Sequence, residues 1–148
     1  METEHLEPKL TASHVTKDTL RVGSKTMVES ASPIGRFQCV FEDDTETGYF
    51  YALDMDRAGN PIVDALHIYN VKDVTDRDTP STLHILWSPD ANRAAIFINS
   101  YPHAIFDFSG GVGCCRTGFP EPASGSGSHD WDESLLAPFF ASDTQDGG

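Results

Sequence analysis

Basic residues are scarce in this sequence. Lys and Arg number 10 among 148 residues, against 23 Asp and Glu, which gives a formal net charge of −13 at pH 7. Nucleic acids and anionic membrane surfaces are bound through a basic face, so we expect neither as a partner. The acidity then has two interpretations: it serves solubility alone, or it attracts a basic protein.

Cysteines and long apolar runs are also few. No stretch approaches the roughly 20 apolar residues that a membrane-spanning helix needs. Residues 1–8 are polar and acidic, unlike the basic start and apolar run of a signal peptide. The three cysteines (Cys39, Cys114 and Cys115) are an odd number and make no disulfide framework. Reduced thiols are typical of the cytoplasm, and we therefore expect a cytoplasmic, soluble protein.

The most apolar part of the chain extends from Leu83 to Phe108. Its first half alternates apolar and polar residues with period two, which is typical of a strand with one buried face. A Ser-Pro-Asp-Ala-Asn turn at 88–92 separates it from a second run rich in Ile and Phe. This pattern predicts a central hairpin in which Trp87 and Phe106 are buried.

Further alternating segments predict more strands, over 20–29, 37–41, 49–53 and 62–69, although the last also fits one or two turns of helix. Tight turns join these segments, and residues 42–48 are predicted to form a seven-residue acidic loop. With six or seven short strands in total, we predict a mainly β fold. It would be an antiparallel meander, either a sandwich or a half-barrel, with one short C-terminal helix; the alternative is an α+β fold.

The composition predicts how the chain is divided. Residues 1–18 are polar without periodicity and are expected to form a loose N-terminal arm, followed by a single β-rich domain over 19–120. A Gly/Ser-rich linker is expected over 121–129. Residues 130–148 would form a short helix, capped by Asp130, and a frayed tail.

Motifs for metal or cofactor chemistry fail on their spacing. Residues 54–59 begin like a calcium loop, but Ala58 and Ala65 stand where that loop needs oxygen ligands. Cys114 and Cys115 are adjacent, whereas zinc sites use cysteines two to four residues apart. No glycine-rich phosphate loop is present. We therefore predict no metal, no cofactor and no catalytic residue.

The predicted acidic loop is the strongest candidate for a binding site. Four carboxylates fall within residues 42–46, next to a run of aromatic residues. Carboxylates attract a basic partner and exposed aromatic side chains anchor one. The alternative is an ordinary solvated turn beside core aromatics. The predicted binding residues are Glu42, Asp43, Asp44, Glu46, Tyr49 and Tyr51.

A second candidate is a pocket at the glycine-rich bend of residues 110–113. Arg116 follows the cysteine pair, where its charge would favour a thiolate, and His103 could act as a base. The alternative function is therefore a small enzyme or ligand-binding domain that uses His103, Cys115 and Arg116. A structural salt bridge is the simpler interpretation of Arg116.

Several runs resemble a family of small bacterial proteins of unknown function. They are VFEDDTETGYFYALD at 40–54, DALHIYNV at 64–71, WSPD at 87–90 and CRTGFP at 115–120, so the resemblance covers about residues 20–120. The family has no established activity, and no site residues follow from it. Small acidic bacterial proteins of this kind include immunity proteins that block toxins. Our hypothesis is a protein-binding module, with an immunity-type inhibitor as its most specific form. Its oligomeric state is open.

Overall fold

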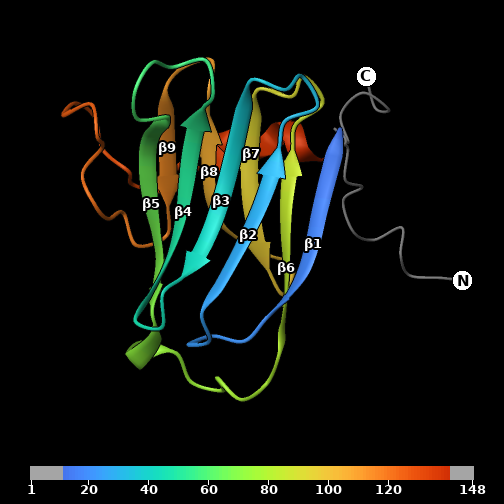
Figure 1. The fold of residues 1–148 in the computed structure, drawn as a ribbon, viewed down its shortest axis with the longest axis vertical. Helices are drawn as coiled ribbons and strands as arrows, with labels where there is room; N and C mark the ends of the chain where they lie inside the picture. The colour runs from blue at the N-terminus through green and yellow to red at the C-terminus, as the bar shows by residue number, and fades with distance from the viewer. Residues whose placement is uncertain (1–11, 141–148) are drawn as a thin grey trace, which may run out of the picture.

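The computed structural model describes residues 12–140, which form two antiparallel β-sheets packed face to face (Figure 1). The strands are β1 His14–Leu20, β2 Thr26–Ala31, β3 Phe37–Asp43, β4 Thr47–Asp54, β5 Ile62–Asn70, β6 Ser81–Trp87, β7 Arg93–Ile98, β8 Tyr101–Asp107 and β9 Val112–Cys115. Two short 3-10 helices, η2 Val71–Asp73 and η3 Glu133–Phe139, complete the described elements. No helix in this part of the chain is long and apolar enough to cross a bilayer.

Each sheet is an antiparallel meander. The four-stranded sheet has the order β2-β3-β4-β5, and the five-stranded sheet has the order β1-β6-β7-β8-β9. Neighbouring strands follow one another along the chain except at β1, which pairs with β6. The prediction of a mainly β fold built from antiparallel meanders is confirmed, in its sandwich form.

The core lies between the two sheets. Alternate residues of β3 and β4, among them Phe41 and Phe50, are fully buried against Ile85 and Trp87 of β6 and Phe106 of β8. Because strand side chains alternate between faces, the same periodicity that buries these residues directs their neighbours outward. The central hairpin predicted from the sequence is confirmed as the centre of the core.

Trp87 joins the two sheets through its polar edge as well as its ring. Its indole Nε1 donates to Ser30 Oγ on β2 at 3.0 Å, and its ring stacks on Phe108 at 5.7 Å. Ser30 Oγ also lies 2.8 Å from Thr16 Oγ1 on β1. The indole nitrogen is thus satisfied although the side chain is fully buried, as a buried tryptophan requires.

A third layer covers the outer face of the five-stranded sheet. Outward residues of this sheet, including Phe97 and Ile105, pack against Leu136 and Phe139 of η3, which lies behind β7 and β8 in Figure 1. Within residues 12–140, the outer face of the four-stranded sheet is covered at its β5 edge alone, where Phe119 packs on His67. The sandwich therefore has one covered and one largely uncovered outer face.

Two strands lie where none was predicted, so the described residues contain nine strands rather than six or seven. β1 begins at His14, and the prediction of a loose arm is therefore wrong for residues 14–18. The single strand predicted over 20–29 is broken by a turn in which Gly23 has φ +94°. β9 forms in the segment predicted to be a glycine-rich break.

The C-terminal predictions also need correction. The helix is a 3-10 helix that begins at Glu133, is capped by Asp132 rather than Asp130, and contains Pro138 instead of ending before it. The Asp132 carboxylate accepts a hydrogen bond from Ser134 N at 3.0 Å. Residues 1–11 of the predicted arm and the tail over 141–148 lie outside the described residues.

The predicted linker is fixed against β5. It belongs to a longer segment, residues 117–132, which we call the strap. His129 is buried: its Nε2 lies 2.8 Å from Asp64 Oδ2, and its Nδ1 lies 2.6 Å from the Pro120 carbonyl. A carbonyl only accepts, so Nδ1 must carry a proton and donate it. Asp64 also accepts from Ala123 N at 3.2 Å, and this carboxylate therefore ties both ends of the predicted linker to the sheet.

The position of Trp87 generates a stability prediction. Trp87→Ala should lower the free energy of unfolding by about 3–5 kcal/mol, because it empties a large volume in the core. Chemical denaturation measures this loss, with the half-exposed Val112→Ala as a control of little effect. A loss below about 1 kcal/mol would show that this hairpin is not the centre of the core.

Candidate functional site

The uncovered face of the four-stranded sheet carries three of the predicted binding residues. In β3 and β4, Phe41 and Phe50 point into the core, so Glu42, Tyr49 and Tyr51 point outward by alternation. His67 and Ala65 lie opposite the two tyrosines on β5. We call this surface the aromatic face: Met27, Val40, Glu42, Tyr49, Tyr51, Leu53, Ala65, His67 and Phe119.

A continuous row of rings crosses this face. Tyr51 and Tyr49 stack with centroids 5.9 Å apart, Tyr49 meets the edge of His67 at 5.3 Å, and His67 meets Phe119 of the strap at 5.8 Å. The His67 ring is held in place by Thr117 Oγ1 and Asn70 Oδ1, both at 3.0 Å. These contacts fix the rings in preferred offset and edge geometries before any partner binds.

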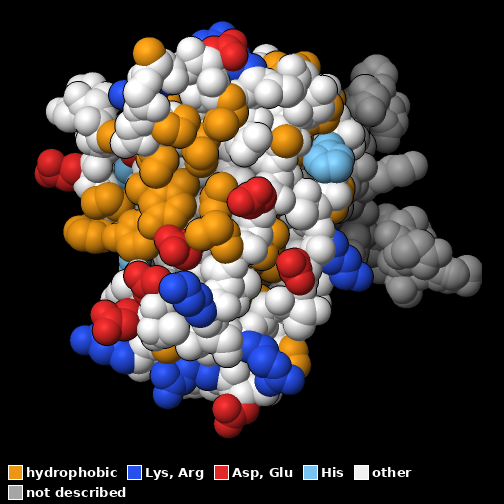
Figure 2. All heavy atoms as spheres, viewed as in Figure 1, with side chains coloured by type: hydrophobic (Ala, Val, Ile, Leu, Met, Phe, Trp, Pro, Cys, Tyr) orange, Lys and Arg blue, Asp and Glu red, His pale blue; other side chains and the backbone are white. Residues whose placement is uncertain are grey.

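Apolar surface gathers around the row. Figure 2 shows hydrophobic side chains concentrated over β3 to β5, on the face nearest the viewer. Met27 is 58% exposed and Phe119 57% exposed. An exposed apolar patch on a small protein is typical of a surface that meets a partner.

A carboxylate stands beside the rings. Tyr51 donates its hydroxyl to Glu42 Oε1 at 3.3 Å. Burial raises the pKa of Tyr51, and the nearby charge of Glu42 raises it further. Aromatic surface and negative charge therefore lie side by side on this face.

Asp43 does not belong to this surface, and its prediction as a solvated loop residue is wrong. Its side chain is fully buried and accepts hydrogen bonds from Gly23 N at 2.7 Å, Tyr69 Oη at 2.6 Å and Thr45 N at 2.8 Å. Burial and this hydrogen bond raise the pKa of Tyr69. Asp43 therefore ties together three segments of the fold. The predicted seven-residue loop shortens to residues 44–46, because β3 runs to Asp43 and β4 begins at Thr47.

The other two loop acids have separate tasks. Asp44 Oδ1 accepts from Glu46 N at 2.9 Å and Thr47 N at 2.8 Å, and these backbone donors lower the pKa of Asp44. Asp44 thus shapes the turn. The Glu46 side chain makes no hydrogen bond within residues 12–140 and lies at a hollow on the end of the sandwich. Of the four predicted acids, only Glu42 and Glu46 are free of backbone donors.

The three residues predicted to form the second site, at the glycine-rich bend, do not come together around one pocket. Cys115 points into the core, where its sulfur lies 3.4 Å from the Phe119 carbonyl. Arg116, the next residue, points to the other side: it lies between Trp131 and Tyr101, 3.6 and 4.6 Å from the ring centroids. Its Nε donates to the Pro102 carbonyl of β8 at 3.0 Å, so Arg116 connects β8 to the strap, and it forms no salt bridge within residues 12–140.

His103 faces a different hollow. Burial, helped by the charge of Arg116, lowers its pKa to about 4, which keeps the imidazole neutral near pH 7. Neither Cys115 nor Arg116 lines the hollow that His103 shares with Tyr69 and Ile98. Cys114 is buried as well, although it precedes Cys115 in the strand and points to the opposite face, and burial raises the pKa of its thiol.

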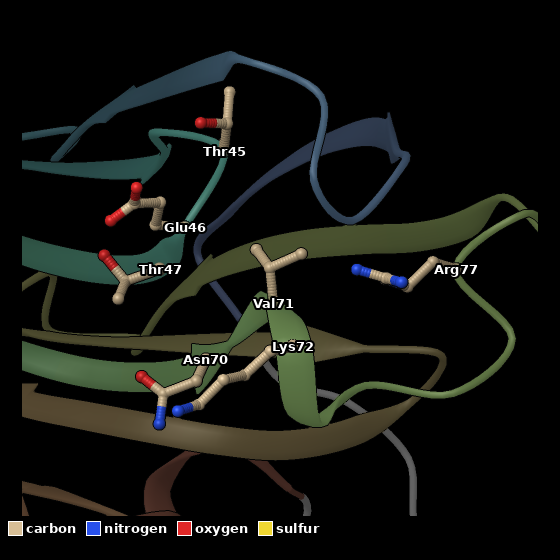
Figure 3. A pocket seen from close by; sticks show the side chains of 7 residues that line it. All are labelled: Thr45, Glu46, Thr47, Asn70, Val71, Lys72 and Arg77. Atoms are coloured by element: carbon tan, nitrogen blue, oxygen red, sulfur yellow. The ribbon is translucent and has the colours of Figure 1, made fainter.

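A hollow of about 410 Å³ at one end of the sandwich was not predicted from the sequence (Figure 3). We call it the end hollow; it is lined by Thr45, Glu46, Thr47, Asn70, Val71, Lys72 and Arg77. Three of these residues, Val71, Lys72 and Arg77, come from the segment that connects β5 to β6. Nothing in their spacing shows that this segment folds back beside the turn at 44–46.

Fold and site together define a small β-sandwich protein with one covered and one aromatic outer face. Residues 20–140 match the family described as uncharacterized proteins conserved in bacteria (DUF2251), and the chain belongs to this family. A relative from Haemophilus influenzae, itself described as an uncharacterized protein, is 43% identical over 111 residues, which are 74% of this chain and 69% of the relative. No solved structure matches the chain. The predicted family resemblance is confirmed, and the match includes the strap and η3.

The different environments of the acids generate a prediction. Asp43→Asn should lower the free energy of unfolding by about 1–3 kcal/mol, because an amide replaces an oxygen that faces buried donors. Glu42→Gln and Glu46→Gln are the matched controls and should change it by less than about 0.5 kcal/mol. Urea denaturation measures all three; equal effects would contradict the assigned role of Asp43.

Proposed function

We propose that this chain is a protein-binding module that docks a basic partner on its aromatic face. The observation that carries the proposal is the asymmetry of the sandwich. One outer face is covered by η3, whereas the other presents apolar side chains and a row of aromatic rings beside a carboxylate. An uncovered face of this composition matches the anatomy of interface centres, where tyrosine is enriched.

The geometry suits rapid and specific association. The tyrosines are already stacked, so little side-chain freedom is lost when a partner covers them. A formal charge of −13 attracts a basic protein over long range, and Glu42 offers a local carboxylate for its Arg or Lys. Apolar contact would then hold the complex while charge guides its formation.

The kind of partner that we propose to test first is a bacterial toxin that this chain blocks, as an immunity protein does. Its support is the small size, the acidity and the bacterial family. We further propose that the protein acts in the cytoplasm, since its three cysteines are unpaired thiols. The alternative, an enzyme or ligand-binding pocket at the glycine-rich bend, has less support because Cys115 and Arg116 point to opposite sides.

A pull-down with matched tyrosine variants tests the aromatic face. The double variant Tyr49→Ala/Tyr51→Ala should lose a partner that the wild type retains, since anchoring aromatics contribute about 2 kcal/mol or more each. Tyr101→Ala removes an exposed tyrosine from the other sheet and should retain the partner. Equal retention by all three proteins would contradict docking on this face.

Association kinetics with the retained partner test the role of charge. Glu42→Gln/Glu46→Gln should slow association at low salt and have little effect at high salt, because exposed charges are screened beyond about 8 Å at physiological ionic strength. The dissociation rate should change little, whereas Tyr49→Ala should raise it. Unchanged association at both salt concentrations would show that these acids do not steer the partner.

A further inference from the structure

The end hollow gathers cations that the fold itself does not use. Elsewhere in residues 12–140, arginines pair with carboxylates or are fixed by backbone carbonyls, as at Arg36, Arg57, Arg93 and Arg116. The side chains of Lys72 and Arg77 have no hydrogen bond or ion pair in the described part of the chain, yet both line the end hollow. Figure 2 shows blue side chains gathered at this end, the lower one in the view, on a molecule that is otherwise strongly acidic.

Separate segments bring these groups together. Thr45 comes from the turn between β3 and β4, Lys72 from η2, and Arg77 from the loop that follows η2 (Figure 3). In that view the Arg77 guanidinium points from its loop toward Val71, and Lys72 lies alongside Asn70. The volume of about 410 Å³ is in the range of small-molecule sites.

A second hollow of about 350 Å³ adjoins the first and shares Thr45, Val71 and Arg77 with it. Arg21 lines this second hollow. One of its guanidinium nitrogens donates to the Asp78 carbonyl at 3.1 Å, which fixes the side chain and leaves its other donors available. This end therefore has room for a ligand larger than one anionic group, and Arg21 supplies a third cation.

Thr45 is held in a strained conformation at this place. Its φ is +83°, in the left-handed region that a β-branched residue rarely adopts and that glycine adopts freely. Its Oγ1 makes no hydrogen bond within residues 12–140, although the side chain lines both hollows. Strain of this kind is concentrated at functional sites, and here it places an unused hydroxyl in the lining that the two hollows share.

We propose that the end hollow binds a small phosphate ester. Lys72 and Arg77 would hold the phosphate oxygens by charge-assisted hydrogen bonds, with the Thr45 hydroxyl as a neutral donor. The Glu46 carboxylate lies in the same hollow and repels a bare anion, but accepts a hydrogen bond from a hydroxyl of the ligand. The ligand class is therefore a phosphate ester that also carries hydroxyl groups. This site is separate from the aromatic face and does not depend on the protein-binding function.

Titration by NMR tests the proposal, with glycerol 3-phosphate and inorganic phosphate as probes at constant ionic strength. Amide signals of residues 44–47 and 70–77 should shift with glycerol 3-phosphate. Lys72→Met and Arg77→Gln should each weaken binding about tenfold, the size of one charge-assisted hydrogen bond. Lys17→Met removes a lysine of β1 that also lacks an ion pair within the described residues, and should leave the affinity unchanged.

Three further variants separate the site from general attraction between charges. Glu46→Gln should tighten inorganic phosphate more than glycerol 3-phosphate. Thr45→Gly should raise Tm by relieving the strain while it weakens binding, and Thr45→Ser, which retains the hydroxyl, should bind as the wild type does. If about 10 mM phosphate ester causes no shifts, the site binds more weakly than most metabolite sites do, and the proposal is overturned. An equal loss in Lys17→Met, or equal binding of citrate, would also overturn it.

Discussion

The alternation of side chains along a β-strand is the constraint on which this structure depends. Packing two sheets together buries one face of each and leaves two outer faces to be covered or exposed. The two outer faces differ in this respect. Leu136 and Phe139 of η3 pack against the five-stranded sheet, whereas Tyr49 and Tyr51 stay at the surface of the four-stranded sheet. The aromatic face is therefore not a loop feature but the reverse side of the core strands β3, β4 and β5.

The strap that leads to the covered face has a buried polar anchor. Asp64 points inward from β5 and meets His129 at 2.8 Å, so the strap is held by a buried pair before it reaches η3. The Arg116 guanidinium adds a second hold, 3.6 Å from the Trp131 ring centroid. A buried pair of this kind contributes little net stability but is costly to break, which favours one position of the strap over others. Phe119, at the start of the strap, then lies beside His67 and completes the aromatic row.

Much of the fold was predictable because apolar alternation is a local signal. The central hairpin, β3, β4 and β5 follow from it, and so does the outward position of Tyr49 and Tyr51. β1 could not be found this way: it lies at the edge of its sheet with most side chains exposed, so its sequence shows no apolar period. β9 was hidden by Gly113, where the Phe106 ring packs so closely that a Cβ would come within 2.8 Å of it. The strap escaped prediction because one distant partner, Asp64, fixes a segment of flexible composition.

The acidic run at 42–46 shows why charge in a sequence does not translate directly into charge on a surface. Alternation places Glu42 outside and Asp43 inside, and three donors hold Asp43 there. Asp44 is occupied by the turn that it forms, and Glu46 faces the end hollow. Four carboxylates within five residues thus lie in four different environments, which are set by strand register and by the positive φ of Thr45. The buried Asp43 connects the two proposed surfaces physically: it anchors the turn that carries Thr45 and Glu46, and its neighbour in the strand is Glu42 of the aromatic face.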